Sequence, residues 1–381
     1  MEQIMIRCTI MRGGTSKGIF LHENDLPQDP AKRDKMILSI FGSPDVRQID
    51  GLGGADPLTS KLAIVGPSSR PDADVDYTFG QISIDKALVD YSGNCGNISS
   101  AVGPFAIDEG LVKAVEPVTK VRIYNTNTGK ILVAEVPVKD GKAQVIGDYA
   151  IAGVPGTGAK IMMDFAGTVG AATGKMLPTG NVKDVMYVDG VGEIEVSVVD
   201  VANPMVFVRA ADLGLKGTET PAEIDGDERM RKILETIRAK TAVLIGMAAT
   251  EEEATLKSPA FPMLAFVSPP QSYKSFTTGK EIAAEDVDLV SRLMFMQVMH
   301  KTYAGTGTTC TGAAAKIPGT IVHEVCASKD ARVRIGHPAG VLEIEVETEV
   351  QEGQVVLKRA AFGRTARRIM DGYVYVPVNK V

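Results

Sequence analysis

Short apolar stretches separated by Gly- and Pro-containing segments make up most of the chain, and a few longer stretches carry apolar residues at helical spacing. That spacing predicts amphipathic helices over residues 30–41, 227–245 and 284–300. Alternation of apolar and polar residues over 131–138 and 192–199 predicts half-buried strands. This mixture is typical of α+β or α/β domains built on curved sheets.

Similar segments recur in the same order in the two halves of the chain, which predicts a duplicated domain. Each half has a strand that leads into an acidic turn, a cysteine near a stretch of small residues, and a pair of strands around a turn. The matching pairs are 18–27 with 205–214, 94–110 with 309–325, and 121–145 with 333–357.

The repeat places a domain boundary near Lys183. The predicted domains are therefore residues 1–183 and 184–370, and a last strand within 371–381 is expected to pair back with the first domain. A chain of 381 residues fits two domains of middling size, which leaves room for a cleft between them.

Composition and charge exclude several classes of protein. The chain has 44% hydrophobic and 23% charged residues and no apolar run long enough to span a membrane, as expected of a soluble cytoplasmic protein. No secretory signal is visible, and the spacing of the four cysteines suits neither a metal site nor a disulfide framework. The net charge of −6, scattered basic residues and lack of Trp argue against a nucleic-acid partner.

Two cysteines occupy similar surroundings. Cys95 follows a Gly- and Asn-containing turn and precedes small residues that predict the first turns of a helix. The backbone amides at such a helix start bind carboxylates, and the helix dipole favours a thiolate. Cys310 follows AGTGTT and precedes TGAAAK, which predicts a second helix start of the same kind. The alternative for each thiol is a small buried residue that packs the turn.

Lys61 follows a Gly-rich loop and opens the apolar segment LAIVG. A lysine that is partly removed from water has a lowered pKa and can act as a general base for a carbon-bound proton. The alternative is a surface lysine whose ammonium group reaches the solvent.

Two further segments carry candidate polar groups. The Gly-Gly turn before Thr15 and Ser16 suits a hydroxyl and amides that converge on one oxygen, although it could be a simple hairpin turn. His300 lies at the end of the helix predicted over 284–300, where it could reach a ligand or cap the negative helix end.

The segments that carry these residues resemble the diaminopimelate epimerase-like superfamily, and within it the branch of methylaconitate isomerases, 3-methylitaconate Δ-isomerases and 4-oxalomesaconate tautomerases. The resemblance implies an α+β fold of two topologically similar domains, each with a mixed sheet around a central helix, and a cleft between them. It also implies that the protein uses no metal and no cofactor. The matching segments are MRGGTSKGIFL (11–21), GGADPLTSKLAIV (53–65), SGNCGNISSAVGPFAIDEGLV (92–112) and HKTYAGTGTTCTGAA (300–314).

By this resemblance, Lys61 and Cys95 are the pair that handles protons, and Ser16 and His300 belong to the active site. The resemblance also assigns carboxylate binding to a larger set: Gly96, Asn97 and the 305–310 loop, which contains Gly307, Thr308, Thr309 and Cys310.

The chain also departs from the amino-acid epimerases of the superfamily. After the first cysteine it has Ile98 where they have glycine, and Met205 stands in place of the histidine of their Asn-Pro-His motif. These differences argue against racemisation of a free amino acid.

The predicted reaction is an allylic isomerisation of a small unsaturated di- or tricarboxylate, in which a base removes a proton γ to a carboxyl group and an acid returns it at the far carbon. The favoured substrate is 3-methylitaconate, converted to 2,3-dimethylmaleate, with 2-methylaconitate and 4-oxalomesaconate as alternatives. A two-cysteine epimerase or racemase and a non-enzymatic anion-binding protein are the other functions considered. Assembly into a homo-oligomer is left open.

Overall fold

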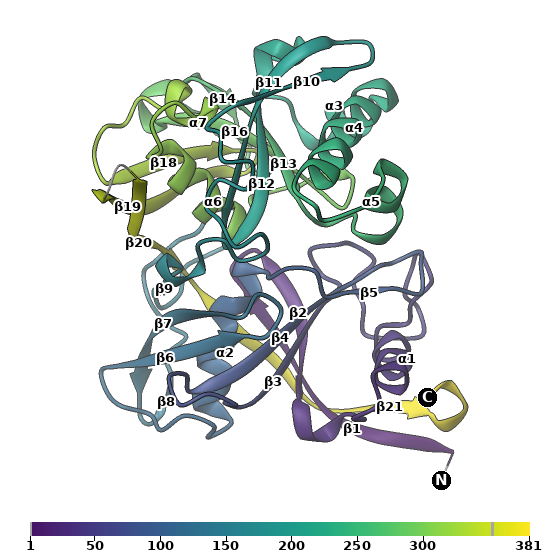
Figure 1. The fold of residues 1–381 in the computed structure, drawn as a ribbon. Helices are drawn as coiled ribbons and strands as arrows, with labels where there is room; N and C mark the ends of the chain where they lie inside the picture. Colours follow the sequence, from purple (N-terminus) through teal and green to yellow (C-terminus); the bar gives the residue numbers. More distant parts are fainter. Residues whose placement is uncertain (1, 352–353) are drawn as a thin grey trace. The chain divides into compact units, whose positions relative to one another are not determined.

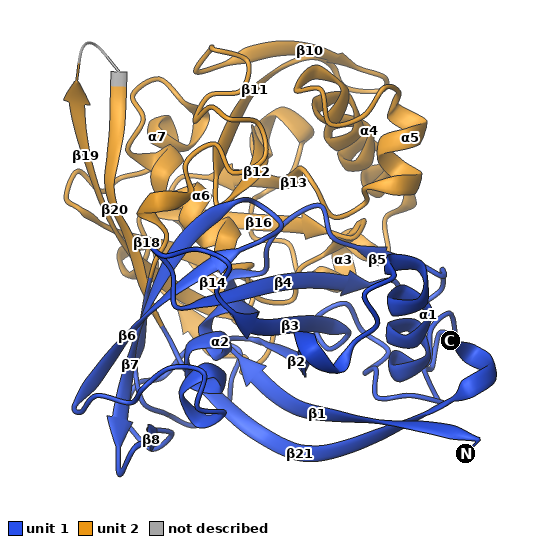
Figure 2. Cartoon of the chain, turned by 60° about the horizontal axis from the view of Figure 1, so that its bottom comes forward, with its two compact units in different colours: residues 1–163, 364–381 blue, residues 164–363 orange. Residues whose placement is uncertain are grey.

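The computed structural model describes residues 2–351 and 354–381 and divides into two compact units (Figure 2). Unit 1 comprises Met1–Met163 and Arg364–Val381, and unit 2 comprises Asp164–Gly363. Lys183 lies inside unit 2, so the chain leaves unit 1 earlier than the sequence repeat suggested. It returns to unit 1 at Arg364.

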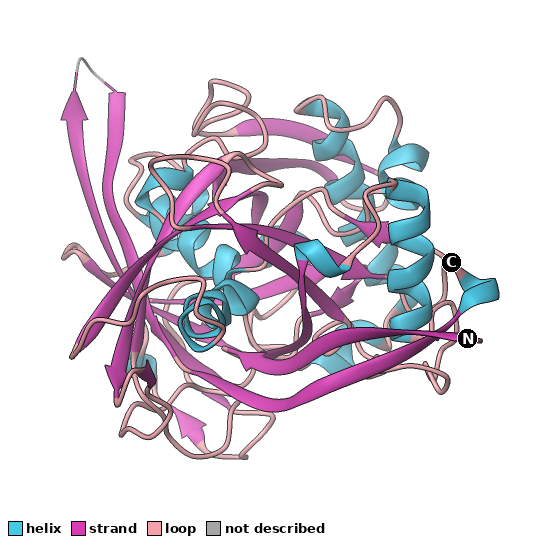
Figure 3. Cartoon of the chain, turned by 90° about the horizontal axis from the view of Figure 1, so that it is seen from below, coloured by secondary structure: helices cyan, strands magenta, loops and turns pink. Residues whose placement is uncertain are grey.

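Strands dominate both units (Figure 3). In unit 1 they form a mixed sheet in the order β21, β1, β2, β3, β4, β6, β7, with β5 beside β4 and β8 beside β7. The expected return of the C-terminal strand is the antiparallel pairing of β21 with β1. The bounds are β1 Gln3–Gly13, β2 Ser16–His22, β3 Lys61–Pro67, β4 Val75–Ile82, β5 Val89–Asp90, β6 Val118–Asn125, β7 Lys130–Lys139, β8 Lys142–Ala143, β9 Ile161–Asp164 and β21 Ala366–Pro377.

Helix α1 (Pro30–Phe41) packs on one face of this sheet and confirms the helix predicted over residues 30–41. The Asp29 carboxylate caps it by accepting a hydrogen bond from the Lys32 amide at 2.9 Å, and Gly42 ends it with φ of 74°. Its apolar stripe joins alternate strand residues in one core, which includes Met36, Ile37, Ile40, Phe41, Ile19, Leu21, Leu62 and Ile64.

Helix α2 (Gly96–Asp108) lies against the other face, and it contacts β1, β2, β3, β6, β7 and β21 (Figure 1). Small residues allow this close packing, because a Cβ at Gly103 would lie 2.8 Å from Val136 Cγ2. The Phe20 ring of β2 lies 5.4 Å from the Phe105 ring of α2. Side chains alternate along a strand, and Gly18 pairs with Lys61, so Ser16 and Lys61 share this α2 face.

Unit 2 repeats this plan. Its strands follow the order β10, β11, β12, β13, β16, β18, β19, β20, with β17 beside β16. Their bounds are β10 Asp184–Val188, β11 Gly192–Val201, β12 Asn203–Arg209, β13 Met263–Ser268, β16 Leu289–Phe295, β17 Val298–Met299, β18 Arg332–His337, β19 Gly340–Gln351 and β20 Gln354–Arg364. The short strands β14 Tyr273–Lys274 and β15 Glu281–Ile282 form a separate two-stranded sheet. The strands predicted over 131–138 and 192–199 are confirmed by β7 and β11.

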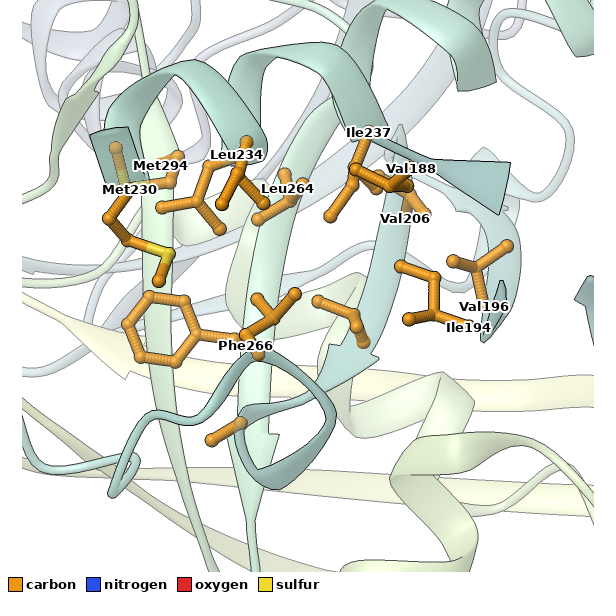
Figure 4. Close-up of a cluster of buried hydrophobic side chains, with 14 of the residues drawn as sticks. Val188, Ile194, Val196, Val206, Met230, Leu234, Ile237, Leu264, Phe266 and Met294 are labelled. Atoms are coloured by element: carbon orange, nitrogen blue, oxygen red, sulfur yellow. The ribbon is translucent and has the colours of Figure 1, made fainter. Parts of the chain in front are cut away.

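Helix α4 (Glu228–Leu244) covers one face of the unit 2 sheet and confirms the helix predicted over 227–245. Figure 4 shows its side chains Met230, Leu234 and Ile237 above the strand residues Val206 and Leu264, with which they form one core. The shorter helices of this unit are α3 Pro221–Asp225, α5 Glu251–Lys257 and α7 Ile321–Val325.

Helix α6 (Gly305–Ala315) takes the place that α2 has in unit 1, and all of its residues are buried. It contacts β11, β12, β18 and β19. Glycines permit this approach, because a Cβ at Gly307 would lie 2.6 Å from Leu293 Cδ1, and one at Gly312 would lie 2.7 Å from Ile344 Cγ2.

The helix predicted over residues 284–300 is wrong, because this segment forms a 3₁₀ turn (Ala284–Asp286) and the strands β16 and β17. Every residue of β16 is buried, so its sequence lacks the polar alternation that would mark a strand. The helical spacing of its apolar residues is therefore a coincidence.

The two units share one topology. In unit 1 the successive pairings β1–β2, β2–β3, β3–β4, β4–β6 and β6–β7 are antiparallel, parallel, antiparallel, parallel and antiparallel. The pairings β11–β12, β12–β13, β13–β16, β16–β18 and β18–β19 of unit 2 follow the same order. The predicted α+β fold, two similar domains with a mixed sheet around a central helix, is confirmed. No helix within the described ranges is long and apolar enough to cross a membrane.

Candidate active site

A buried lysine and a cysteine meet at the start of α2 in unit 1. Lys61 is the first residue of β3 and is 2% exposed. Its Nζ donates a hydrogen bond to Gln81 Oε1 at 2.6 Å, lies 5.5 Å from the centre of the Phe79 ring, and is within electrostatic reach of the Cys95 side chain. The alternative interpretation of Lys61 as a surface lysine is therefore wrong.

Burial controls the acid–base behaviour of Lys61. Desolvation lowers the pKa of its amine below the ordinary value of 10.5, and the charges of Cys95 and Asp56 act in the opposite direction. A lowered pKa makes the neutral amine accessible nearer to neutral pH. That Lys61 accepts a proton from carbon stays a prediction from the sequence, and the lowered pKa suits this role.

We expect kcat/KM to fall as the pH is lowered through the pKa of Lys61, because the ammonium form cannot accept a proton. Since desolvation lowers this pKa, the rising part of the profile should lie below pH 10.5. Initial rates measured across the pH range in which the protein stays folded test this expectation. A rate that decreases with rising pH throughout that range would contradict it.

Gln81 fixes the position of the lysine, although nothing in the sequence singled it out. Its Nε2 donates to the backbone carbonyls of Pro57 and Ser60, each at 3.2 Å. These two hydrogen bonds identify Nε2 as the side-chain amide nitrogen of Gln81. The side-chain amide oxygen, Oε1, is therefore the atom that faces Lys61. Gln81 pairs with Lys61 across β4 and β3, a contact that only the sheet register reveals.

Cys95 is the N-cap residue of α2, which confirms its predicted place at a helix start. Its carbonyl oxygen accepts hydrogen bonds from the Ser99 amide at 2.8 Å and the Ser99 hydroxyl at 2.9 Å. Its thiol makes no capping hydrogen bond within the part of the chain that the structure describes. The sulfur thus lies beside Lys61 and the first amide groups of α2, which begin with Gly96.

The Gly-Gly turn joins β1 to β2 as a tight hairpin and touches the start of α2. Gly14 has φ of 51°, and a Cβ there would lie 2.1 Å from Asn97 Oδ1, so glycine is required on both counts. Asn97 Oδ1 accepts hydrogen bonds from the Thr15 amide at 3.4 Å and from Arg364 Nε at 3.0 Å. The Asn97 side chain therefore positions the turn, whereas its backbone belongs to the first turn of α2.

Ser16 lies on the α2 face of β2, the same face as Lys61. It is 2% exposed, and its hydroxyl oxygen hydrogen-bonds no atom of the described residues. A hydroxyl group can donate one hydrogen bond, which leaves Ser16 able to bind an oxygen atom. The sequence placed Ser16 in the site, and its environment is consistent with that assignment.

Arg364 is a second residue that the sequence did not reveal. It ends β20, is 1% exposed, and lies 267 positions from its partner Asn97. Burial lowers the pKa of its guanidinium to about 10, so the group remains positively charged at neutral pH.

In unit 2, His300 follows β17 rather than a helix, so its predicted role as a helix cap is wrong. The side chain is buried, and His300 Nδ1 accepts a hydrogen bond from the Thr302 amide at 3.1 Å. An accepting Nδ1 carries no proton, so in the neutral ring Nε2 carries it and is a donor. This arrangement suits His300 to bind an oxygen of an anion.

The predicted 305–310 loop is the first half of α6, whose N-cap residue is Ala304. Two of the predicted substrate-binding hydroxyls stay within the helix: Thr308 Oγ1 donates to the Ala304 carbonyl at 3.0 Å and Thr309 Oγ1 to the Gly305 carbonyl at 3.2 Å. Gly307 packs against Leu293, as its missing Cβ allows. The amide groups at the start of the helix are the part that suits carboxylate binding.

Cys310 lies within α6 rather than at its start, so the prediction of a second cysteine at a helix N-terminus is wrong. Its thiol donates to the Val199 carbonyl at 3.2 Å. The side chain is fully buried, and desolvation raises the thiol pKa. Because the residues on both sides of Cys310 are small, the sequence does not distinguish the helix start from the helix interior. The N-cap residue is Ala304.

Within residues 2–351 and 354–381 there is no cluster of three or more His, Cys, Asp or Glu side chains that could hold a metal ion. The predicted site residues that lie in unit 1 supply an amine, a thiol, a hydroxyl and the amides of a helix start.

Comparisons with known proteins agree with the resemblance seen in the sequence. The sequence model described as PrpF protein matches residues 3–377. The chain is 65% identical over 382 residues to a 3-methylitaconate isomerase from Eubacterium barkeri, with 100% of this chain and 99% of that protein covered. It is 42% identical to a 2-methyl-aconitate isomerase from Shewanella oneidensis, with 98% of each covered. A crystal structure of a methylitaconate-delta-isomerase matches with a TM-score of 0.81 and 64% identity, over 100% of this chain and 97% of that one.

Proposed function

This chain belongs to the PrpF protein family, and we propose that it is an isomerase that converts 3-methylitaconate to 2,3-dimethylmaleate. The observation that carries the proposal is the buried Lys61 amine, with its lowered pKa, within electrostatic reach of Cys95 at the start of α2. The full-length likeness to a 3-methylitaconate isomerase supports the choice of substrate. An amine and a thiol suffice for two proton transfers, so the proposed reaction needs no cofactor.

The first step is removal of a proton from carbon. In 3-methylitaconate the carbon that bears the methyl group has one hydrogen, which is α to a carboxylate and allylic to the methylene group. Neutral Lys61 takes this proton, the C–H bond breaks, and the electron pair spreads over the allylic carbons and the carboxylate as a dienolate. In the reverse direction the proton leaves a methyl group that is γ to a carboxylate.

The second step returns a proton to the methylene carbon and forms the second methyl group of 2,3-dimethylmaleate. We assign this proton to the Cys95 thiol. The resulting thiolate lies within electrostatic reach of the protonated amine of Lys61, which returns the proton to it. Both groups are then neutral, and the cycle is balanced in atoms and charge.

The dienolate needs hydrogen-bond donors where its charge accumulates, because a carbanion next to a carboxylate is very unstable in water. In unit 1 the Ser16 hydroxyl and the backbone amides of Gly96 and Asn97 are the proposed donors. For unit 2 we propose that His300 Nε2 and the first amides of α6, up to Gly307, bind an anion. The side chains of Thr308, Thr309 and Cys310 have structural hydrogen bonds, so we assign them no direct contact with the substrate.

A panel of acids tests the substrate assignment. The purified protein is mixed with 3-methylitaconate, 2-methylaconitate or 4-oxalomesaconate, and the change in ultraviolet absorbance gives kcat/KM for each. We expect the highest value for 3-methylitaconate. A higher value for either of the other acids would replace it as the substrate, and turnover of none would contradict an isomerase function.

Cys310→Ala should keep the isomerase rate within about threefold of the wild-type rate, because the thiol is bonded to a backbone carbonyl and takes no part in the reaction. The free energy of unfolding should fall by about 1 kcal/mol through the lost packing. Steady-state rates and thermal unfolding measure the two effects. A two-cysteine epimerase would instead lose its activity in this variant.

A further inference from the structure

We propose that Arg364 binds a carboxylate of the substrate at the start of α2 and so selects acids that carry two negative charges. The inference rests on the proposed function for the identity of the acid, and it adds the residue that recognises its second charge. It concerns unit 1 alone, where Arg364, the Gly-Gly turn and the start of α2 meet.

The position of the guanidinium is well defined. Arg364 Nε donates to Asn97 Oδ1 at 3.0 Å, and Asn97 is the second residue of α2. The Arg364 side chain also lies against Gly14, because a Cβ at that glycine would be 3.1 Å from Arg364 Cδ. The cationic group therefore lies beside the same helix start that holds Cys95.

Neighbouring hydrogen bonds hold the backbone at Arg364 in place. The carbonyl of Thr365, the next residue, accepts hydrogen bonds from the Gly14 amide at 2.9 Å and from Arg12 Nη1 at 2.8 Å. Arg12 Nη1 also donates to the Gly14 carbonyl at 2.8 Å. Two guanidinium groups thus lie at one turn, Arg12 bonded to backbone carbonyls and Arg364 to the side chain of a helix residue.

The charge of Arg364 is retained inside the protein. It is 1% exposed, and desolvation lowers its pKa to about 10, which leaves it protonated at neutral pH. Tyr149 and Cys95 influence its pKa in the opposite direction, so Arg364 lies within electrostatic reach of the candidate catalytic thiol. A buried cation is costly, and an anion bound beside it would offset that cost.

The chemistry of arginine fits a carboxylate better than that of lysine. Its guanidinium presents donors in a rigid planar fork that matches the two oxygens of a carboxylate. Together with the amides at the start of α2, Arg364 gives this end of the site a positive potential. An acid with two carboxylates gains from this potential in addition to the contacts of its reacting end.

The test measures equilibrium binding of 2,3-dimethylsuccinate, which has the carbon skeleton of the proposed substrate but no double bond and so is not turned over. Isothermal titration calorimetry is applied to the wild type, Arg364→Gln and Arg364→Lys. We expect Arg364→Gln to bind about 10- to 100-fold more weakly, because it loses a charge-assisted hydrogen bond. Arg364→Lys keeps the charge without the fork, so its affinity should be intermediate.

Arg292→Gln is the matched control. Arg292 is also 1% exposed, and its donors are engaged by the carbonyls of Glu219 and Ser291 in unit 2. Its loss should reduce thermal stability and leave the dissociation constant within about twofold of the wild-type value. This control separates the removal of a buried arginine from the loss of a ligand contact.

Wild-type affinity in a folded Arg364→Gln or Arg364→Lys protein would overturn the inference, with circular dichroism as the measure of folding. If Arg364→Gln does not fold, Arg364→Lys alone decides. Failure of the proposed function is seen separately: a wild-type protein that binds 2,3-dimethylsuccinate in an Arg364-dependent manner but does not isomerise 3-methylitaconate would contradict the reaction and support the role of Arg364.

Discussion

Lys61→Ala should lower the turnover of 3-methylitaconate by about 10³-fold or more, because the variant has no group to remove the proton from carbon. Binding of 2,3-dimethylsuccinate should change only modestly, since the helix amides and Arg364 remain. We therefore expect Lys61→Ala to lower kcat strongly and to change the dissociation constant of the ligand only slightly. Initial rates by ultraviolet absorbance and titration calorimetry measure the two effects on the same protein.

Two further variants make this result specific to the amine. Lys61→Arg should not recover the rate, because a guanidinium stays protonated and cannot accept the proton. Lys17→Ala removes a lysine that is half-buried on the opposite face of β2, and it should retain nearly full turnover. Near-normal turnover of Lys61→Ala would refute the assignment and move the base role to Cys95 or His300.

Cys95→Ala should lower kcat by about 10²-fold or more, because the proposed donor for the second proton transfer is lost while Lys61 remains. A hydroxyl is a weaker acid than a thiol, so Cys95→Ser should also be slow. Cys8→Ala is a suitable control, since Cys8 is buried in the core of the same unit. A wild-type rate in Cys95→Ala would leave Lys61 to carry both proton transfers.

Much of the fold could be predicted because short-range patterns of apolar, polar and capping residues determine many of its helices and strands. The helix over 30–41 has a capping Asp29, Pro30 and a terminal Gly42, and the alternation over 131–138 marks a strand with one buried face. The internal repeat predicted the duplicated topology. By contrast, β16 is buried on both faces, and its two polar residues, Ser291 and Arg292, are adjacent, so no alternation of polar and apolar residues marks it as a strand.

The candidate site was predicted in part, for a similar reason. Lys61 and Cys95 stand next to recognisable local features, a glycine-rich loop and a helix start. Gln81 lies beside Lys61 because of the register between β3 and β4, and Arg364 contacts Asn97, which is 267 positions away in the sequence. Local sequence patterns do not predict such long-range contacts. The start of α6 was misplaced because residues 305–315 are small throughout, and composition alone does not mark where such a helix begins.

The central claim is that Lys61 drives an allylic proton shift in 3-methylitaconate. Proton NMR of this acid incubated in parallel with the wild-type protein and with Lys61→Ala tests it most directly. With the wild type we predict that the vinylic methylene signals decay while the methyl signal of 2,3-dimethylmaleate grows, and that over the same period both stay constant with Lys61→Ala. Equal decay in the two samples, or constant signals with the wild type, would contradict the claim.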